Sequence, residues 1–165
     1  MQKANALSNK WRKELAFPLT ATIVILSDQL TKLLAKSVLE SKPPAPEHYF
    51  FRWTYVENEG AAFGLLTNAS FLIIFAAVMA ITTIVVYYRF PNYWNHSLLK
   101  IGLGLMLGGA IGNLFDRLRL GYVVDFIDFR VWPVFNIADS AISVGVIILA
   151  FYFIFIYKDK EDSKG

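Results

Sequence analysis

Polar side chains that could do chemistry gather between residues 113 and 139, where one apolar segment ends and another begins. They are four aspartates, two asparagines and an arginine: Asp116, Asp125, Asp128, Asp139, Asn113, Asn136 and Arg117. Ionisable groups at the edge of a bilayer core are energetically costly, and they usually face a polar cavity or a partner. The cluster therefore indicates a functional site at a membrane surface.

Asp125 and Asp139 are the residues that could carry out hydrolysis if a returning loop brings their carboxyl groups together. Two close carboxylates do not both ionise readily, so one keeps a proton near neutral pH. The ionised group can take a proton from water while the protonated group polarises a carbonyl, which hydrolyses an amide without metal, Cys or His. The alternative is that each aspartate caps a helix or pairs with Arg117, Arg119 or Arg130. The residues alone leave these two interpretations even.

Three neighbouring polar residues could support this pair. Asn136 precedes Asp139 by three residues and shares a helix face with it, so it could orient a carboxyl group or simply be a helix N-cap. Asn113 and Arg117 are spaced i and i+4, with Asp116 beside them. Arg117 could steady the carboxylates or bind lipid phosphates. The slightly favoured alternative is a membrane-edge anchor that pairs with an aspartate.

Two earlier stretches add polar residues. Asp28 and Lys32 lie near the end of the first apolar segment at i and i+4, which predicts an ion pair on one helix face. Asp28 could instead satisfy polar backbone groups around the site. Asn58 is followed by small residues, which is typical of a turn.

The composition limits the class of protein. Hydrophobic residues make up 56% of the chain and charged residues only 18%, which is too apolar for an ordinary soluble domain and indicates an integral membrane protein. There is no Cys, and His48 and His96 are far apart, so neither a metal site nor a Ser-His-Asp triad is expected. The net charge is +3, and the basic residues form no clustered patch in the sequence, so no nucleic-acid binding is expected.

Hydropathy predicts a membrane α-helical fold with four transmembrane helices in one domain, residues 1–165. The predicted spans are residues 15–34, 71–88, 98–115 and 137–157, and glycines in the third permit close approach of another helix. Strand-forming residues at 49–56 predict a small extracytoplasmic β-sheet, which residues 131–134 could join, followed by a short surface helix. The distribution of Lys and Arg predicts cytoplasmic termini, with the acidic cluster on the outer side.

Four sequence blocks resemble, in order and spacing, the signature blocks of bacterial lipoprotein signal peptidase (signal peptidase II). The blocks are residues 28–32, 58–63, 108–127 and 135–142. The resemblance implies a multi-pass aspartic endopeptidase of the bacterial inner membrane, without a cofactor or metal. Its substrates would be prolipoproteins whose Cys carries diacylglycerol, and it would cut just before that Cys.

The resemblance also implies roles for individual residues. Asp125 and Asp139 would be the catalytic pair, and the supporting residues would be Asp28, Lys32, Asn58, Gly109, Asn113, Asp116, Arg117 and Asn136. Residues 44–56 would belong to the extracytoplasmic sheet, and residues 58–68 would form the surface helix over the site. The partners would be prolipoproteins and membrane lipids, with acyl chains lying among the spans where the glycine-rich third span leaves room. A monomer is expected.

Two functions other than that of a signal peptidase fit the sequence less well. Intramembrane aspartic proteases of the presenilin or prepilin-peptidase type share a Gly-x-Gly-Asp motif, whereas Gly102-Leu103-Gly104 is followed here by Leu105. A small transporter or channel would place carboxylates near span midpoints and show an inverted repeat. The aspartates lie instead at span ends, and no repeat is visible.

Overall fold

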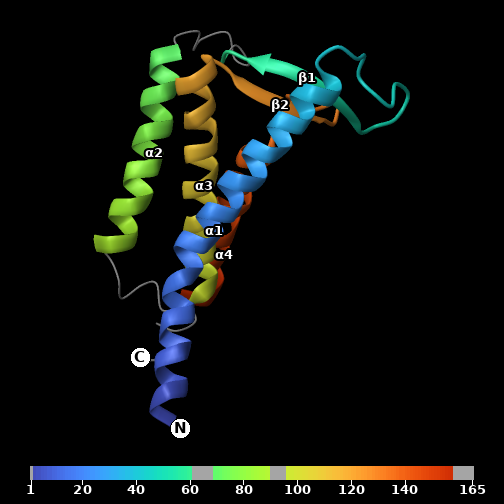
Figure 1. Ribbon diagram of the computed structural model, residues 1–165. Coiled ribbons are helices and arrows are strands. Elements are labelled where there is room, and N and C mark those ends of the chain that lie inside the picture. The colour runs from blue at the N-terminus through green and yellow to red at the C-terminus, as the bar shows by residue number, and fades with distance from the viewer. Residues whose placement is uncertain (1, 61–68, 90–95, 158–165) are drawn as a thin grey trace.

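Long apolar segments of this chain fold into helices that carry a small sheet at one end (Figure 1). The computed structural model describes residues 2–60, 69–89 and 96–157, with only the backbone described for residues 2–14, 69–72 and 157. The elements in order are α1 (Gln2–Leu39), β1 (Arg52–Asn58), α2 (Ala69–Arg89), α3 (Ser97–Leu120), β2 (Val123–Asp128), α4 (Ile137–Phe151) and η3 (Tyr152–Tyr157), a π-helical continuation of α4.

The described part of each predicted span lies within a helix. Within the described chain, Ser97–Leu120 and Ile137–Ile156 are long and apolar enough to cross a membrane, with mean hydropathies of 1.6 and 2.2, and the apolar stretch Ile73–Arg89 is shorter. Large apolar side chains are exposed along α1, including Leu26 at 64% and Leu33 at 57%. Exposed apolar side chains over helices of this composition suit contact with lipid rather than water.

The glycines of α3 bring the neighbouring helices into close contact. A Cβ atom at Gly104 or Gly108 would lie 2.7 Å from a backbone oxygen of α1, and one at Gly109 would lie 2.4 Å from the Ala138 oxygen of α4. Contact at these distances is possible only for glycine, as in other small-residue helix interfaces. The expectation that the glycines leave room for acyl chains is therefore wrong, because neighbouring helices fill that space.

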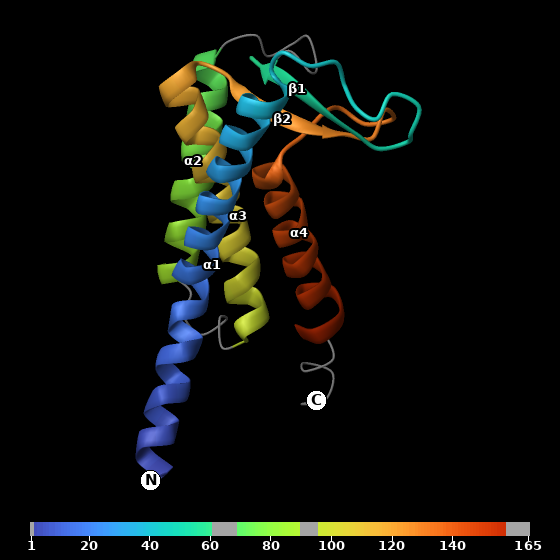
Figure 2. The same cartoon turned by 45° about the vertical axis from the view of Figure 1, so that its right-hand side comes forward.

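The sheet lies at the end of the helices that is opposite the N-terminus (Figures 1 and 2). Strands β1 and β2 are antiparallel, and Val56 pairs with Asp125. The expectation that residues 131–134 could join the sheet is wrong, because these residues form no strand. Pro133 in that segment has no N–H to donate. Phe135, the first residue after the segment, makes an isolated bridge to Ile127. The surface helix predicted at residues 58–68 falls mostly outside the described residues.

Candidate active site

The first turn of α4 holds Asp139 in a fixed orientation. Asn136 is the N-cap of the helix, and its Oδ1 accepts a hydrogen bond of 3.0 Å from the Asp139 backbone N–H. Asp139 Oδ2 in return accepts a hydrogen bond of 3.3 Å from the Asn136 N–H. This reciprocal capping box satisfies two backbone donors at the helix start. It also places the Asp139 carboxyl group at the N-terminal end of α4.

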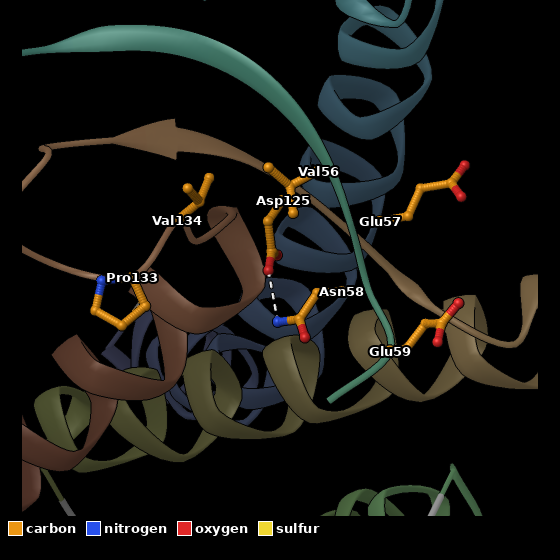
Figure 3. Close-up of a pocket in the computed structure, with 7 residues that line it drawn as sticks. All are labelled: Val56, Glu57, Asn58, Glu59, Asp125, Pro133 and Val134. Atoms are coloured by element: carbon orange, nitrogen blue, oxygen red, sulfur yellow. Dashed lines mark hydrogen bonds between the residues drawn. The ribbon is translucent and has the colours of Figure 1, made fainter. Parts of the chain in front are cut away.

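Asp125 comes to the same place from the sheet. Its side chain is 1% exposed, and its Oδ1 accepts a hydrogen bond of 2.6 Å from Asn136 Nδ2. Its Oδ2 accepts one of 2.8 Å from Asn58 Nδ2 at the end of β1 (Figure 3). Because the Asn136 residue bonds to Asp125 and to Asp139, the sequence-predicted pair is joined through one residue.

The environment favours a proton on Asp125. Burial, together with the negative charge of Asp139, raises the pKa of Asp125 to about 7, against the hydrogen bonds from Asn58 and Asn136. A carboxyl group with such a pKa exchanges its proton near neutral pH, as general acids and bases do. The environment of Asp125 therefore suits a carboxyl group that holds a proton and can pass it on.

A buried lysine lies behind the pair. Lys32 is 3% exposed, and its Nζ lies 2.8 Å from Asp28 Oδ2 and 2.9 Å from Asp116 Oδ2. The same Nζ donates to Asn113 Oδ1 at 2.9 Å, and Asn113 Nδ2 donates to Asp139 Oδ1 at 2.7 Å. The predicted Asp28–Lys32 pair is confirmed, and the lysine connects α1 and α3 to the candidate pair.

Asp28 and Gln29 complete this network. Asp28 Oδ1 accepts a hydrogen bond of 2.9 Å from the Ala138 backbone N–H, which ties α1 to the first turn of α4. Gln29 Nε2 donates to Asp116 Oδ1 at 2.9 Å. Sequence reasoning did not single out Gln29. Its signal was a polar side chain within an apolar span directly beside Asp28.

The structure does not bear out the favoured interpretation of Arg117, which was an ion pair with Asp116 or Asp128. Asp116 is paired with Lys32 and Asp128 with Arg52, so neither aspartate holds Arg117. The Arg117 guanidinium instead donates to the Asn113 carbonyl oxygen at 3.4 Å. Arg117 is thus close to the network without being ion-paired to those two carboxylates.

A cavity of about 380 Å³ opens beside Asp125. Its lining residues are Val56, Glu57, Asn58, Glu59, Asp125, Pro133 and Val134. In Figure 3 the Asn58 amide points at Asp125, and the carboxylates of Glu57 and Glu59 point away from Pro133 and Val134. Within the described residues, no group of three or more His, Cys, Asp or Glu side chains could hold a metal ion. The arrangement suits acid–base chemistry by Asp125 on a backbone segment that enters this cavity, with Asp139 joined to Asp125 through Asn136.

Comparisons with known proteins agree on one family. The family described as signal peptidase (SPase) II matches residues 20–155. The chain is similar to the lipoprotein signal peptidase of Moorella thermoacetica, with 48% identity over 81% of this chain and 89% of that one. It is also similar to that of Caldanaerobacter subterraneus subsp. tengcongensis, with 50% identity over 86% of this chain and 97% of that one.

A solved structure is similar to the whole fold. It is a bacterial membrane enzyme determined by the in meso method at 1.9 Å resolution. The TM-score is 0.74 at 29% identity, and the match covers 85% of this chain and 93% of that one. The likeness supports the expectation of a helical membrane enzyme with a small sheet.

Proposed function

The chain belongs to the signal peptidase II family of lipoprotein-processing peptidases, and from this premise we propose a specific reaction and a catalytic pair. The substrates are prolipoproteins whose Cys carries diacylglycerol, and the cut falls just before that Cys. Asp125 and Asp139 carry out the hydrolysis. The observation that carries the proposal is the bridge through Asn136, which bonds to both aspartates.

The two aspartates take different roles. Asp139 is the base, because its carboxyl group lies at the start of α4 and accepts hydrogen bonds from the Asn113 amide and the Asn136 N–H, which leaves the proton to Asp125. Asp125 is the acid, because burial raises its pKa to about 7. This division needs neither a metal nor a cofactor.

The reaction then follows from these two roles. Asp139 takes a proton from a water molecule as the water oxygen attacks the scissile carbonyl carbon. Asp125 donates its hydrogen bond to the carbonyl oxygen, where negative charge develops. The proton held by Asp139 passes to the leaving amide nitrogen as the carbon–nitrogen bond breaks, which releases the signal peptide and the amino group of the lipidated Cys.

The remaining chain places this site at a membrane surface. We propose that all four apolar helices span the bacterial inner membrane and that both termini are cytoplasmic. The sheet and the pair then face the periplasmic or outer side, and the monomer is the working unit. Binding of the acyl chains positions the peptide at the pair, so remote binding energy serves the chemical step. Because the glycines of α3 are packed against helices, those chains bind elsewhere on the spans.

A cleavage assay tests the proposal. The purified chain in lipid is mixed with a diacylglyceryl-modified prolipoprotein, beside Asp125→Asn, Asp139→Asn and Glu59→Gln. Wild type and Glu59→Gln should cut before the modified Cys, because Glu59 is an exposed carboxylate of the same cavity. Each aspartate variant should lose at least about 10²-fold in rate, the usual worth of a general acid or base.

Two results would contradict parts of the proposal. Retained turnover in a folded Asp125→Asn or Asp139→Asn variant would remove that residue from the catalytic pair. Equal cleavage of unlipidated precursor would show that the acyl chains do not position the substrate.

A further inference from the structure

A second cavity lies between the sheet and the C-terminal part of α1, apart from the candidate active site. It measures about 310 Å³ and is lined by Thr31, Leu34, Ala35, Val38, Leu39, Trp53 and Phe126. The α1 members follow the spacing i, i+3, i+4, i+7 and i+8, so they form one apolar face of the helix. Trp53 and Phe126 stack on each other, with ring centroids 6.1 Å apart, and form the opposite wall.

The sheet separates this groove from the catalytic pair. Consecutive residues of a strand point to opposite faces. On β2, Asp125 lines the active-site cavity and its neighbour Phe126 lines the groove. The two cavities therefore lie on opposite faces of one two-stranded sheet.

Water is a poor occupant for the groove. Its volume would hold roughly ten waters at the about 30 Å³ that each occupies in the liquid. The one hydroxyl in the lining, that of Thr31, is already engaged with the carbonyl oxygens of Ser27 and Asp28, at 2.8 and 2.9 Å. A water molecule needs two to four polar partners to be well held. An apolar ligand fits the lining better.

The groove continues the lipid-facing surface of α1. Leu30 and Leu33, outside the groove, are 59% and 57% exposed, and Leu34 and Val38, inside it, are 54% and 48% exposed. A lipid lying along α1 thus reaches the groove without crossing a polar surface. In the proposed reaction the diacylglycerol is carried by the residue beside the scissile bond, so its point of attachment would lie on the Asp125 face of the sheet.

From these observations we infer that the groove between α1 and the back of the sheet binds an acyl chain of a bilayer phospholipid. The site is distinct from the one that takes the substrate. Its contacts are the apolar face of α1 and the ring pair of Trp53 and Phe126. Each methylene buried there favours binding through the hydrophobic effect.

Quenching of Trp53 fluorescence tests this inference. Replacing Trp11, Trp94 and Trp132 by Phe leaves Trp53 as the only tryptophan. The full chain, purified in detergent, is titrated with phosphatidylcholine that carries brominated acyl chains, because bromine quenches tryptophan on contact. Quenching of Trp53 should saturate. A parallel chain with Trp53→Phe and Leu33→Trp reports contact outside the groove and should show no saturation over the same range.

Matched substitutions identify the groove as the place of binding. Leu34→Phe narrows it and should raise the apparent dissociation constant about tenfold, which corresponds to about 1.4 kcal/mol. Leu33→Phe makes the same change on a similarly exposed neighbour and should leave the titration unchanged. Val38→Phe repeats the block if Leu34→Phe does not fold. Equal titrations in blocked and control chains, or quenching of Trp53 that never saturates, would overturn the inference.

A competition experiment fixes the source of the acyl chain. Diacylglyceryl-modified prolipoprotein added to the bromolipid-loaded chain should leave Trp53 quenched. Recovery of Trp53 emission would assign the groove to the substrate and overturn the phospholipid assignment. The cleavage assay is a separate measurement, so loss of the catalytic proposal and loss of the groove would be told apart.

Discussion

Replacing Asp125 by Asn should make the protein more stable at neutral and alkaline pH while it abolishes cleavage. The Asp125 carboxyl group is almost fully buried, so its ionised form is poorly solvated in the folded state. Asparagine has nearly the same shape and cannot ionise. The substitution therefore removes a destabilising charge along with the carboxyl group that we propose to be catalytic.

The size of the effect follows from the pKa of Asp125. Its ordinary pKa of 3.8 rises to about 7 on folding, so the folded state binds the proton more tightly and wild-type stability falls as pH rises between these values. The loss is about 1.36 kcal/mol per pH unit, or roughly 4 kcal/mol over the window. Against this, asparagine would turn a donor toward Asn58 Nδ2, and loss of that hydrogen bond costs about 1 kcal/mol.

The expected difference in the free energy of unfolding between Asp125→Asn and wild type therefore changes sign with pH. Above about pH 7, Asp125→Asn should be roughly 3 kcal/mol more stable than wild type, and near pH 4 about 1 kcal/mol less stable. Unfolding midpoints measured across this range in one detergent give both numbers. Wild-type midpoints should fall with rising pH, and those of Asp125→Asn should fall much less.

Asp128 on the same strand is the control. Burial raises its pKa, but hydrogen bonds from the Arg52 side chain and the Arg130 N–H outweigh this and hold the pKa below 3.8. Its ionised form therefore stabilises the fold above that value, and Asp128→Asn should lower the midpoint at neutral pH. If Asp125→Asn lowers the midpoint at pH about 8 as Asp128→Asn does, Asp125 is not a destabilising carboxylate and its role as the acid loses its support.

Three further outcomes are expected. Lys32→Met should destabilise the fold by about 3–5 kcal/mol, because it leaves buried carboxylates without their partner. Lys36→Met should have a much smaller effect, because its partner Glu40 lies 3.8 Å away at the surface; equal unfolding midpoints for the two variants would refute this. Gly109→Ala should slow cleavage about 10²-fold by displacing α4, and a rate matching that of the exposed control Leu118→Ala would contradict it. The cleavage rate should fall about tenfold per pH unit above pH about 7, as Asp125 loses its proton; a flat profile in stopped assays would remove Asp125 as the acid.

The sequence predicted the helices well because the signal for them is local. Each predicted span depended on an apolar run, and the structure has a helix over the described part of every one. The helices run further than predicted. Residues 35–39, outside the predicted first span, continue α1, because hydropathy measures the length of an apolar run and carries no signal for where the backbone hydrogen bonds stop.

The strand at residues 123–128 was not predicted, and residues 131–134 were expected in the sheet instead, for a physical reason. Residues 123–128 contain Asp125 and Asp128, and aspartate is depleted in strands. Residues 131–134 contain Val and Trp, which are enriched. Pairing with β1 decided the outcome, since Arg52 opposite Asp128 binds that carboxylate and Asn58 binds Asp125. Favourable partners on another strand outweigh the low strand propensity, and single-sequence reasoning does not see those partners.

The candidate site likewise combines contacts between residues near in the sequence with contacts between residues far apart in it. Asp139 is oriented by Asn136 three residues earlier, an arrangement readable from the sequence as a helix start. Asp125 is oriented by Asn58, 67 residues away, and Lys32 holds Asp116 from a different helix. One half of the candidate pair can form as soon as α4 forms, whereas the other half exists only once the sheet has paired and α1 has packed on α3. Because the raised pKa of Asp125 depends on that burial, the two carboxyl groups become chemically different only in the folded enzyme, so the unfolded chain has two ordinary aspartates and no acid–base pair.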